Sequence, residues 1–289
     1  MPLPKRTVDE LIFVYARQPD MLQGGIFVEG VGDKVILDNY LYMQGIGGKY
    51  VYCMDTIDFS GIDIKAMGLP FPSNRSAVIA LRKVMKEAGV DIARVRFLVD
   101  RDQEDFLATR HLEGVDLTDA GALPVHLFDN RVERNIAAIV ARGKISYETL
   151  KSSVVGICLD IYALRVVNGR KDYGMKFISP VSYVAGCLVG GFHFDIRAYV
   201  HGCIQAGRCG CLPADVLHEF DEVRRELEEL GSPKYRFIND HDLWAVLKAI
   251  LDHATAPMKR SIEDVEALVM ATFDARELAT HRLFSSIVA

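Results

Sequence analysis

The sequence has no apolar run long enough to cross a membrane. Its most apolar long segment, 154–167, contains Asp160 and Arg165 and falls short of the roughly 18 to 20 apolar residues that a transmembrane helix needs. The opening residues, Met-Pro-Leu-Pro-Lys-Arg, also lack the apolar core of a signal peptide. We therefore expect 154–167 to form a buried helix and the protein to be cytoplasmic.

An excess of positive charge is also missing. The 34 Lys and Arg residues are outnumbered by 39 Asp and Glu residues, and the net charge is −5. Proteins that coat nucleic acid are normally strongly basic, so this class is disfavoured. A nuclease is not excluded, because clustered metal-binding acids lower the net charge and bound cations restore positive potential locally.

The chain is not rich in cysteine, and its six cysteines in a cytoplasmic protein indicate reduced thiols. His201, Cys203, Cys209 and Cys211 lie close together in the sequence, but without the Cys-x2-Cys pairs of the usual zinc site. A zinc ion there is conceivable. We favour packed thiols beside a glycine-rich turn.

Several familiar catalytic motifs are absent. The glycine-rich stretch 45–49 lacks the spacing of a phosphate-binding P-loop, so we do not expect the chain to hydrolyse ATP. The sequence has no Gly-x-Ser-x-Gly nucleophile elbow. A phosphatase of the haloacid dehalogenase type is disfavoured, since Asp102 is followed by Gln-Glu and the acid at Glu29 would be unexplained.

What is present in the first half is an alternation of strands and helices. Short apolar runs between turn residues predict buried strands, and Ser73 with Asn74 provides a helix cap. The order predicts an α/β fold with a mostly parallel sheet. The predicted strands are 24–29, 49–54, 94–99 and 123–128, the helices 33–43 and 76–88, and the loops 55–72 and 103–122, the second of them mobile.

The second half has helical periodicity throughout. The predicted helices are 132–141, 146–167, 213–230, 241–253 and 261–285. We expect two parts, an α/β core at 1–143 and a helical region at 144–289 packed on it. In the helix 241–253, the apolar stripe is a candidate surface for pairing with a second copy, although core packing is the commoner use of such a stripe. The stripe consists of Leu243, Trp244, Leu247, Ile250 and Leu251.

Carboxylates follow the apolar runs directly. Glu29 ends the first run, and Asp100 and Asp102 follow 94–99. Strand ends of a parallel sheet form the edge where ligands bind, and residues two apart on an extended segment point to one side. A cation would remove the repulsion among these acids, and oxygen ligands suit Mg²⁺ or Mn²⁺. The alternative is an ordinary turn acid at Glu29 and a solvated acidic loop after residue 99.

A further pair, Asp129 and Glu133, spans the end of the run 123–128 and the start of the next helix. These acids are candidates for a second metal position, with helix capping as the equally favoured alternative. Four basic residues are the nearest in sequence that could contact a nucleic-acid backbone. They are Lys49, Arg101, Arg131 and Arg134.

The blocks Phe27-Val28-Glu29-Gly30 and 98–102 resemble the TOPRIM fold of topoisomerases, primases and OLD-type nucleases. With Asp129-x3-Glu133 and the late block 238–243, the chain also resembles a TOPRIM-like family classed as a domain of unknown function and the nuclease effectors of the PARIS anti-phage system. In that family the late block often reads Asn-Gly-His-Asp, whereas here Asp240 replaces the glycine. This departure puts the geometry of the turn in doubt.

The resemblance implies a Mg²⁺-dependent nuclease, favouring RNA and tRNA in particular, that acts as a toxic effector beside an ABC-type ATPase partner. Asp100 and Asp102 would hold the metal, Glu29 would be a ligand or general base, and Glu133 with Asp129 would complete a second ion. We expect the active form to be a homodimer. The alternatives are a non-catalytic partner-binding or sensor subunit and a DNA nuclease of OLD type.

Overall fold

The structure is a computed structural model that describes residues 5–17, 24–70, 72–107, 112–187, 191–255 and 260–288. Contacts divide the chain into two compact units, each discontinuous in sequence. Unit 1 comprises 1–101, 109–119 and 274–289, and unit 2 comprises 102–108 and 120–273. These extents differ from the expected ranges 1–143 and 144–289, because the last residues of the chain pack with the sheet.

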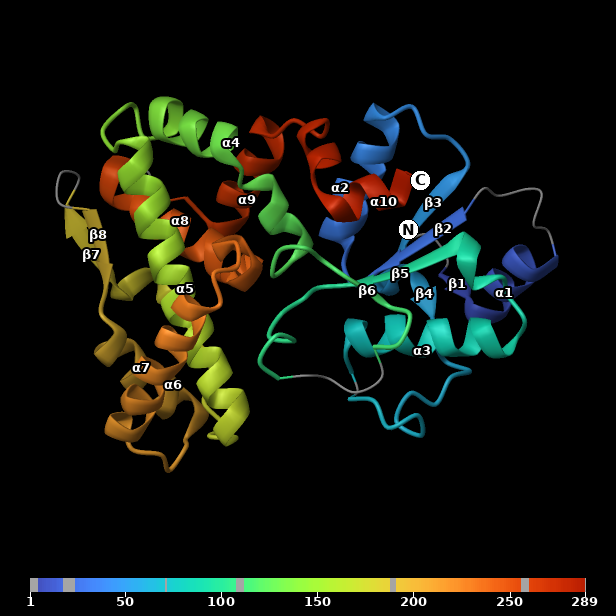
Figure 1. Ribbon diagram of the computed structural model, residues 1–289, viewed down its shortest axis with the longest axis horizontal. Coiled ribbons are helices and arrows are strands. Elements are labelled where there is room, and N and C mark those ends of the chain that lie inside the picture. Colours follow the sequence, from blue (N-terminus) through green and yellow to red (C-terminus); the bar gives the residue numbers. More distant parts are fainter. Residues whose placement is uncertain are drawn as a thin grey trace. The chain divides into compact units, whose positions relative to one another are not determined.

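Unit 1 is built on a four-stranded parallel sheet (Figure 1). The order is β3-β2-β5-β6, and every pairing in it is parallel. All of β2 is buried, as expected for a parallel strand covered on both faces. The predicted α/β fold, with a mostly parallel sheet and a largely helical second half, is confirmed. The strands are β2 (Gly24–Val28), β3 (Lys49–Cys53), β5 (Val95–Val99) and β6 (Asp116–Leu117).

Helices cover both faces of this sheet. The helices α1 and α3 pack against Phe27 and Phe97, which stack on each other with ring centroids 5.2 Å apart. On the side of α2, the Tyr40 hydroxyl donates to the Phe284 carbonyl of α10 at 3.2 Å, which ties the last helix to unit 1. The remaining elements of unit 1 are α1 (Val8–Arg17), α2 (Val31–Met43), α3 (Asn74–Glu87), η3 (Ile92–Arg94), η8 (Glu277–Thr280), α10 (Arg282–Val288), η2 (Met54–Thr56) and a short parallel pair, β1 (Arg6–Thr7) with β4 (Ile57–Asp58).

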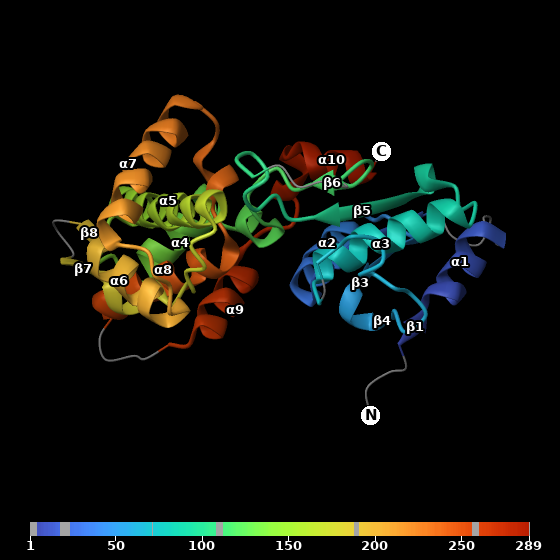
Figure 2. The same ribbon diagram turned by 90° about the horizontal axis from the view of Figure 1, so that it is seen from below.

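Unit 2 is largely helical and is organised around the long helix α5 (Figure 2). This helix is apolar on most of its circumference and packs against α7 and α8, so it is buried, as the run 154–167 predicts. Among the described residues, no helix has the length and apolar character of a membrane span. The elements are η4 (Leu123–Leu127), α4 (Asn130–Asn135), a π-helical turn η5 (Ile136–Val140), α5 (Tyr147–Lys171), η6 (Pro180–Tyr183), the antiparallel hairpin β7 (Val184–Cys187) and β8 (Gly191–Phe194), α6 (Ile196–Gly207), α7 (Pro213–Glu229), η7 (Lys234–Phe237), α8 (Asp240–Thr255) and α9 (Ile262–Thr272).

The predicted strand 123–128 is wrong. Its residues are buried, but they form the 3₁₀ helix η4, because Pro124 has no N–H to donate to a strand ladder. The fourth strand is instead β6, which lies inside the loop predicted over 103–122 and pairs with β5 through Leu98 and Asp116. Part of that loop, 108–111, lies outside the described residues.

Two predictions about the helical half also need correction. The predicted helix 261–285 is broken into α9, η8 and α10. The apolar stripe of 241–253 is core and not a pairing surface, since all five of its residues, 243, 244, 247, 250 and 251, are no more than 1% exposed. The helices α1 and α6 and the hairpin β7–β8 were not anticipated from the sequence.

Candidate active site

The ends of β2 and β5 bring Glu29 and Asp100 together. The strands are paired in parallel with Phe27 opposite Phe97, so the residues that follow them emerge at the same edge. There the Glu29 carboxylate, through Oε1, accepts a hydrogen bond from the backbone N–H of Asp100 at 2.9 Å. Two of the three predicted catalytic acids are therefore neighbours, because the register of two buried strands places them side by side.

A guanidinium lies beside both acids. Arg75, in the first turn of α3, donates through NH1 to the Asp100 carbonyl at 2.6 Å, and the same nitrogen is 4.0 Å from Glu29 Oε1. A cation in the first turn of a helix opposes the helix dipole, so its position is costly unless nearby anions compensate. Glu29 supplies such an anion, and the flat, forked guanidinium has the geometry that binds phosphate or carboxylate.

Asp102 is placed differently from the prediction. It belongs to unit 2, whereas Glu29 and Asp100 belong to unit 1. The expected extended segment ends before Asp102, which has a φ of 45° and donates its backbone N–H to the Gly121 carbonyl at 2.9 Å. Aspartate tolerates this left-handed backbone better than most residues. The premise that 100 and 102 point to one side of a strand is therefore wrong.

Within unit 2, Asp102 lies in the electrostatic environment of Arg165. Burial lowers the pKa of Arg165. The hydrogen bonds and charge of Asp242, with smaller contributions from Tyr199 and Asp102, raise it by more, so the pKa of Arg165 lies above its ordinary value. The Arg165–Asp242 pair is bidentate, with both distances 2.8 Å, and the guanidinium lies over the Phe177 ring.

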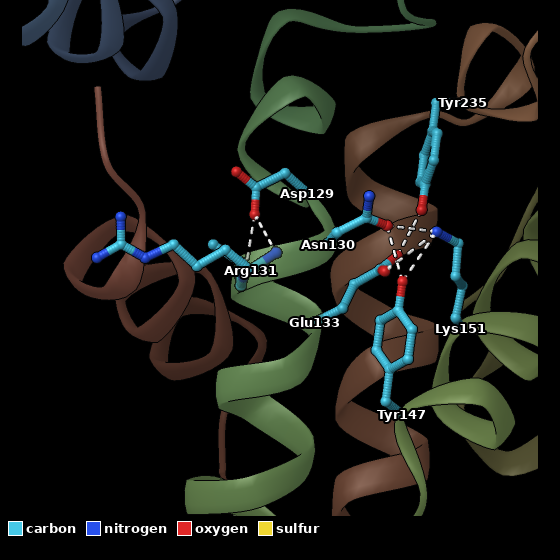
Figure 3. Close-up of polar contacts among 8 residues, drawn as sticks. Asp129, Asn130, Arg131, Glu133, Tyr147, Lys151 and Tyr235 are labelled. Atoms are coloured by element: carbon cyan, nitrogen blue, oxygen red, sulfur yellow. Dashed lines mark hydrogen bonds and ion pairs between the residues drawn. The ribbon is translucent and has the colours of Figure 1, made fainter. Parts of the chain in front are cut away.

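Asp129 and Glu133 have separate partners. The Asp129 carboxylate caps α4 by accepting from the backbone N–H groups of Arg131 at 2.9 Å and Val132 at 2.7 Å. Glu133, fully buried, points the other way, into a polar cluster (Figure 3). The capping alternative therefore accounts for Asp129.

The polar cluster around Glu133 is formed by Asn130, Glu133, Tyr147, Lys151 and Tyr235. The Tyr235 hydroxyl donates to Glu133 Oε1, and Lys151 Nζ lies 3.5 Å from Oε2. Lys151 also donates to Asn130 Oδ1 at 2.6 Å and to the Tyr147 hydroxyl at 3.2 Å. Figure 3 shows these groups converging from α4, α5 and the segment before α8.

Burial controls the acid–base properties of this polar cluster. Desolvation raises the pKa of Glu133 and outweighs the hydrogen bond from Tyr235 and the charge of Lys151, which lower it. Burial lowers the pKa of Lys151, but its bond to Tyr147 and the charge of Glu133 outweigh it, and that pKa lies above its ordinary value. Lys151 thus supplies the positive charge that a second metal ion would otherwise provide to Glu133.

The four predicted phosphate contacts have other roles or surroundings. Lys49 Nζ donates to the Ile287 carbonyl at 2.6 Å, at the end of α10. Arg101 Nε donates to the carbonyl of Thr118, the residue after β6, at 2.8 Å. The Arg134 guanidinium lies over the Tyr147 ring, 5.0 Å from its centroid, and the Arg131 side chain points away from Glu133 (Figure 3).

The late block begins α8 without strain. The Asn239 side chain accepts from the His241 N–H at 3.0 Å, and Asp240 has no positive φ. The backbone at this position therefore does not require a glycine. In the stretch 201–211, Cys203 is buried, whereas Cys209 and Cys211 are partly exposed, and Cys209 Sγ lies 3.4 Å from the Ile204 carbonyl.

Sequence reasoning missed Arg75, Tyr147, Lys151 and Tyr235. For Arg75 a signal was available, since a basic residue in the first helical turn, two residues after the helix cap Ser73, goes against the usual preference of a helix start. The other three are too far from Glu133 in sequence to be linked to it without the tertiary structure.

In the parts of the chain that the structure describes, no three His, Cys, Asp or Glu side chains form a group that could hold a metal ion. The predicted ligands are divided between the two units, so their joint role remains a prediction. The sequence matches no protein-family model and no curated protein. The resemblance to TOPRIM nucleases therefore depends on the short sequence blocks alone.

Proposed function

We propose that this protein is a cytoplasmic, Mg²⁺- or Mn²⁺-dependent nuclease of TOPRIM type that cleaves phosphodiester bonds, with structured RNA such as tRNA as the favoured substrate. The observation that supports it most is the contact between Glu29 and the Asp100 backbone at the ends of adjacent parallel strands. In open α/β sheets this edge is where ligands bind. The resemblance adds a role as a toxic effector in anti-phage defence with an ABC-type ATPase partner.

The donor atoms suit the proposed metal. Glu29 and Asp100 offer carboxylate oxygens, which Mg²⁺ and Mn²⁺ prefer, and neither cysteine nor histidine is part of the proposed set. Glu29 and Asp100 would hold the ion, which when bound would neutralise charge on the scissile phosphate and lower the pKa of a bound water. A contribution of Asp102, which belongs to unit 2, stays a prediction. We leave the second ion out of the proposal, because Asp129 caps a helix and Glu133 pairs with Lys151.

The protein groups would orient the reacting phosphate. Arg75 is positioned by the Asp100 carbonyl, and a guanidinium has the fork geometry that binds phosphate oxygens. The Glu29 carboxylate, next to this guanidinium, can accept the proton of the attacking water or hydroxyl. Holding both groups at one sheet edge reduces the entropy lost when the reactants are brought together.

The test is incubation of the purified full chain with tRNA, single-stranded RNA or plasmid DNA, in Mg²⁺, Mn²⁺ or EDTA. We expect metal-dependent cleavage of RNA, loss of cleavage in Glu29→Gln and Asp100→Asn, and unchanged cleavage in the matched control Asp9→Asn, an exposed acid of unit 1. Circular dichroism would establish that each variant is folded. Full activity in Glu29→Gln would remove Glu29 from the mechanism.

The same experiment separates the alternatives. Exclusive nicking of plasmid would overturn the RNA preference in favour of a DNA nuclease of OLD type. Cleavage of no substrate under any metal condition, by folded protein, would contradict the nuclease and favour a non-catalytic partner-binding subunit.

A further inference from the structure

The helix α3 carries a row of cations that begins at the candidate active site. At 100° per residue, Arg75, Arg82 and Lys86 lie within about 20° of one line along the helix, and Lys83 is beside it. At about 1.5 Å per residue, Arg82 is about 10 Å from Arg75 along the axis, and Lys86 about 6 Å further. Figure 1 shows α3 running along the sheet of unit 1.

The distal cations of this row, Arg82, Lys83 and Lys86, differ from most helical cations in their partners. Among the described residues, no ion pair involves Arg82, Lys83 or Lys86, although acids outnumber bases in the chain. Cations on other helices are commonly paired, as are Arg170 with Glu226 and Lys248 with Asp252. The three like charges of Arg82, Lys83 and Lys86 repel one another, and a polyanion would relieve that repulsion.

Arg82 is held in place by a neutral group. Its Nε donates to the Gly114 carbonyl at 2.9 Å, so the guanidinium is oriented without losing its net charge. Gly114 has a φ of +70°, and a Cβ atom built on it would come within 1.9 Å of Arg82 NH2. The left-handed backbone at this position favours glycine, and a side chain there would displace the Arg82 guanidinium.

A pocket of about 470 Å³ opens beside the row. It combines the three distal cations with an apolar floor, and two acids lie among its lining residues. A phosphate can contact the cations while an unstacked base covers the apolar floor, a combination that single-stranded nucleic acid offers and an intact duplex does not. The residues of the pocket are Met67, Leu69, Ile79, Arg82, Lys83, Lys86, Glu87 and Glu113.

We propose that α3 and this pocket form the path for a single strand of nucleic acid leading away from Glu29 and Asp100. The proposal rests on the proposed nuclease function and specifies its substrate as a single-stranded segment, such as a loop or tail of a folded RNA. The row spans about 16 Å, which corresponds to about five nucleotides of a helical strand.

The test measures binding without cleavage. Fluorescence anisotropy of a labelled single-stranded RNA of about 12 nucleotides, with the full chain in EDTA, would be recorded across a salt series for wild type and for Arg82→Gln/Lys83→Gln/Lys86→Gln. Each lost phosphate contact reduces the salt slope by about 0.7, so the triple variant should lose about 2 in slope and about a hundredfold in affinity at 0.1 M salt.

The matched control is Arg225→Gln/Lys144→Gln/Lys176→Gln. It removes the same residue types and the same charge from exposed positions of unit 2, and Arg225 Nε also donates to a backbone carbonyl. This control should keep most of the affinity, as should the charge-preserving variant Arg82→Lys/Lys83→Arg/Lys86→Arg. Thermal unfolding of each variant would exclude misfolding as the cause of weaker binding.

Three results would overturn the path: an unchanged salt slope in the triple variant, an equal loss in the control, or equal binding of a duplex of the same length. Failure of the nuclease proposal is distinguishable from these. If wild type cleaves nothing but binds single-stranded RNA through the three cations, the path stands and the catalytic assignment falls. If wild type cleaves RNA and the triple variant binds and cleaves it normally, the path falls.

Discussion

Arg75 links the two candidate catalytic residues that the sheet brings together. It contacts the Asp100 carbonyl directly and Glu29 more distantly, from a helix start where a cation is otherwise unfavourable. The contact is at the beginning of the basic row of α3. A single side chain therefore connects the acids of the sheet edge with the surface that we propose to bind the substrate.

If Arg75 binds the reacting phosphate, Arg75→Gln should lower kcat by about a hundredfold while the protein stays folded, because one directed donor to a developing charge is lost. Arg75→Lys keeps the charge but not the fork and should recover only part of the rate. The rate of RNA cleavage measures both, with Lys65→Gln, an exposed cation of unit 1, as control. Equal rates for wild type and Arg75→Gln would assign Arg75 a purely structural role.

Because the pKa of Glu133 is raised, we expect the stability of the protein to depend on pH. Its pKa in the folded protein is raised above the ordinary 4.5, so the folded state holds this proton more tightly than the unfolded chain. The resulting stabilisation is present below pH 4.5 and is lost as the pH rises through the folded-state pKa. Relative to Glu133→Gln, wild type should therefore lose stability as the pH rises above 4.5.

Urea unfolding at a series of pH values measures this difference. The companion variant Tyr235→Phe removes a hydrogen bond that lowers the pKa of Glu133, so its loss of stability with rising pH should be larger than that of wild type. Parallel pH curves for wild type and Glu133→Gln would show that Glu133 does not titrate as we infer.

At the scale of elements, the helix α10 packs against α2 and contributes to the core of unit 1. The Phe284 ring of α10 is fully buried and meets the Tyr40 ring of α2 edge-on, with centroids 5.1 Å apart. Lys49, at the start of β3, donates to a carbonyl near the end of α10, where a cation also suits the helix dipole. The terminal residues thus contribute to the core beside β2 and β3.

Phe284→Ala should lower the free energy of unfolding by about 3 to 5 kcal/mol, because it removes a buried ring and leaves a cavity. The exposed Val288, in the same helix, provides the control, and Val288→Ala should cost less than about 0.5 kcal/mol. Urea or thermal denaturation measures both. Similar small losses in the two variants would mean that α10 adds little to the stability of unit 1.

At the scale of the whole molecule, charge limits how the protein attracts a polyanion. The net charge is −5, and among the described residues Arg82, Lys83 and Lys86 of α3 take part in no ion pair. The binding of a long substrate would therefore depend strongly on salt. A second copy would double the basic surface presented to one substrate.

We expect the active form to be a homodimer, because pairing two copies raises the local positive potential and the effective concentration of sites on a long substrate. The helix 241–253 does not provide the pairing surface, since its apolar stripe is buried in unit 2. Light scattering of the active full chain should give about twice the chain mass of 32.2 kDa. An active species with the mass of one chain at assay concentration would contradict the dimer.

The sequence by itself determined the α/β class, the strands β2, β3 and β5, and the position of Glu29 and Asp100 at strand ends. These features are local, because a short apolar run bounded by turn residues forms a buried strand with its following acid at the edge. A proline inside the run 123–128 was the local feature that already argued against a strand there.

Only the tertiary structure determined which residues contact the candidate acids Glu29, Asp100 and Glu133. Contacts between distant parts of the chain determine that β6 is the fourth strand and that the backbone turns at Asp102. They also determine the contact of Arg75 with Asp100 and the pairing of Glu133 with Lys151 and Tyr235. Such contacts are selected by burial and by the need of each buried polar group for a partner. That requirement acts only once the chain has packed, so no local pattern in the sequence records it.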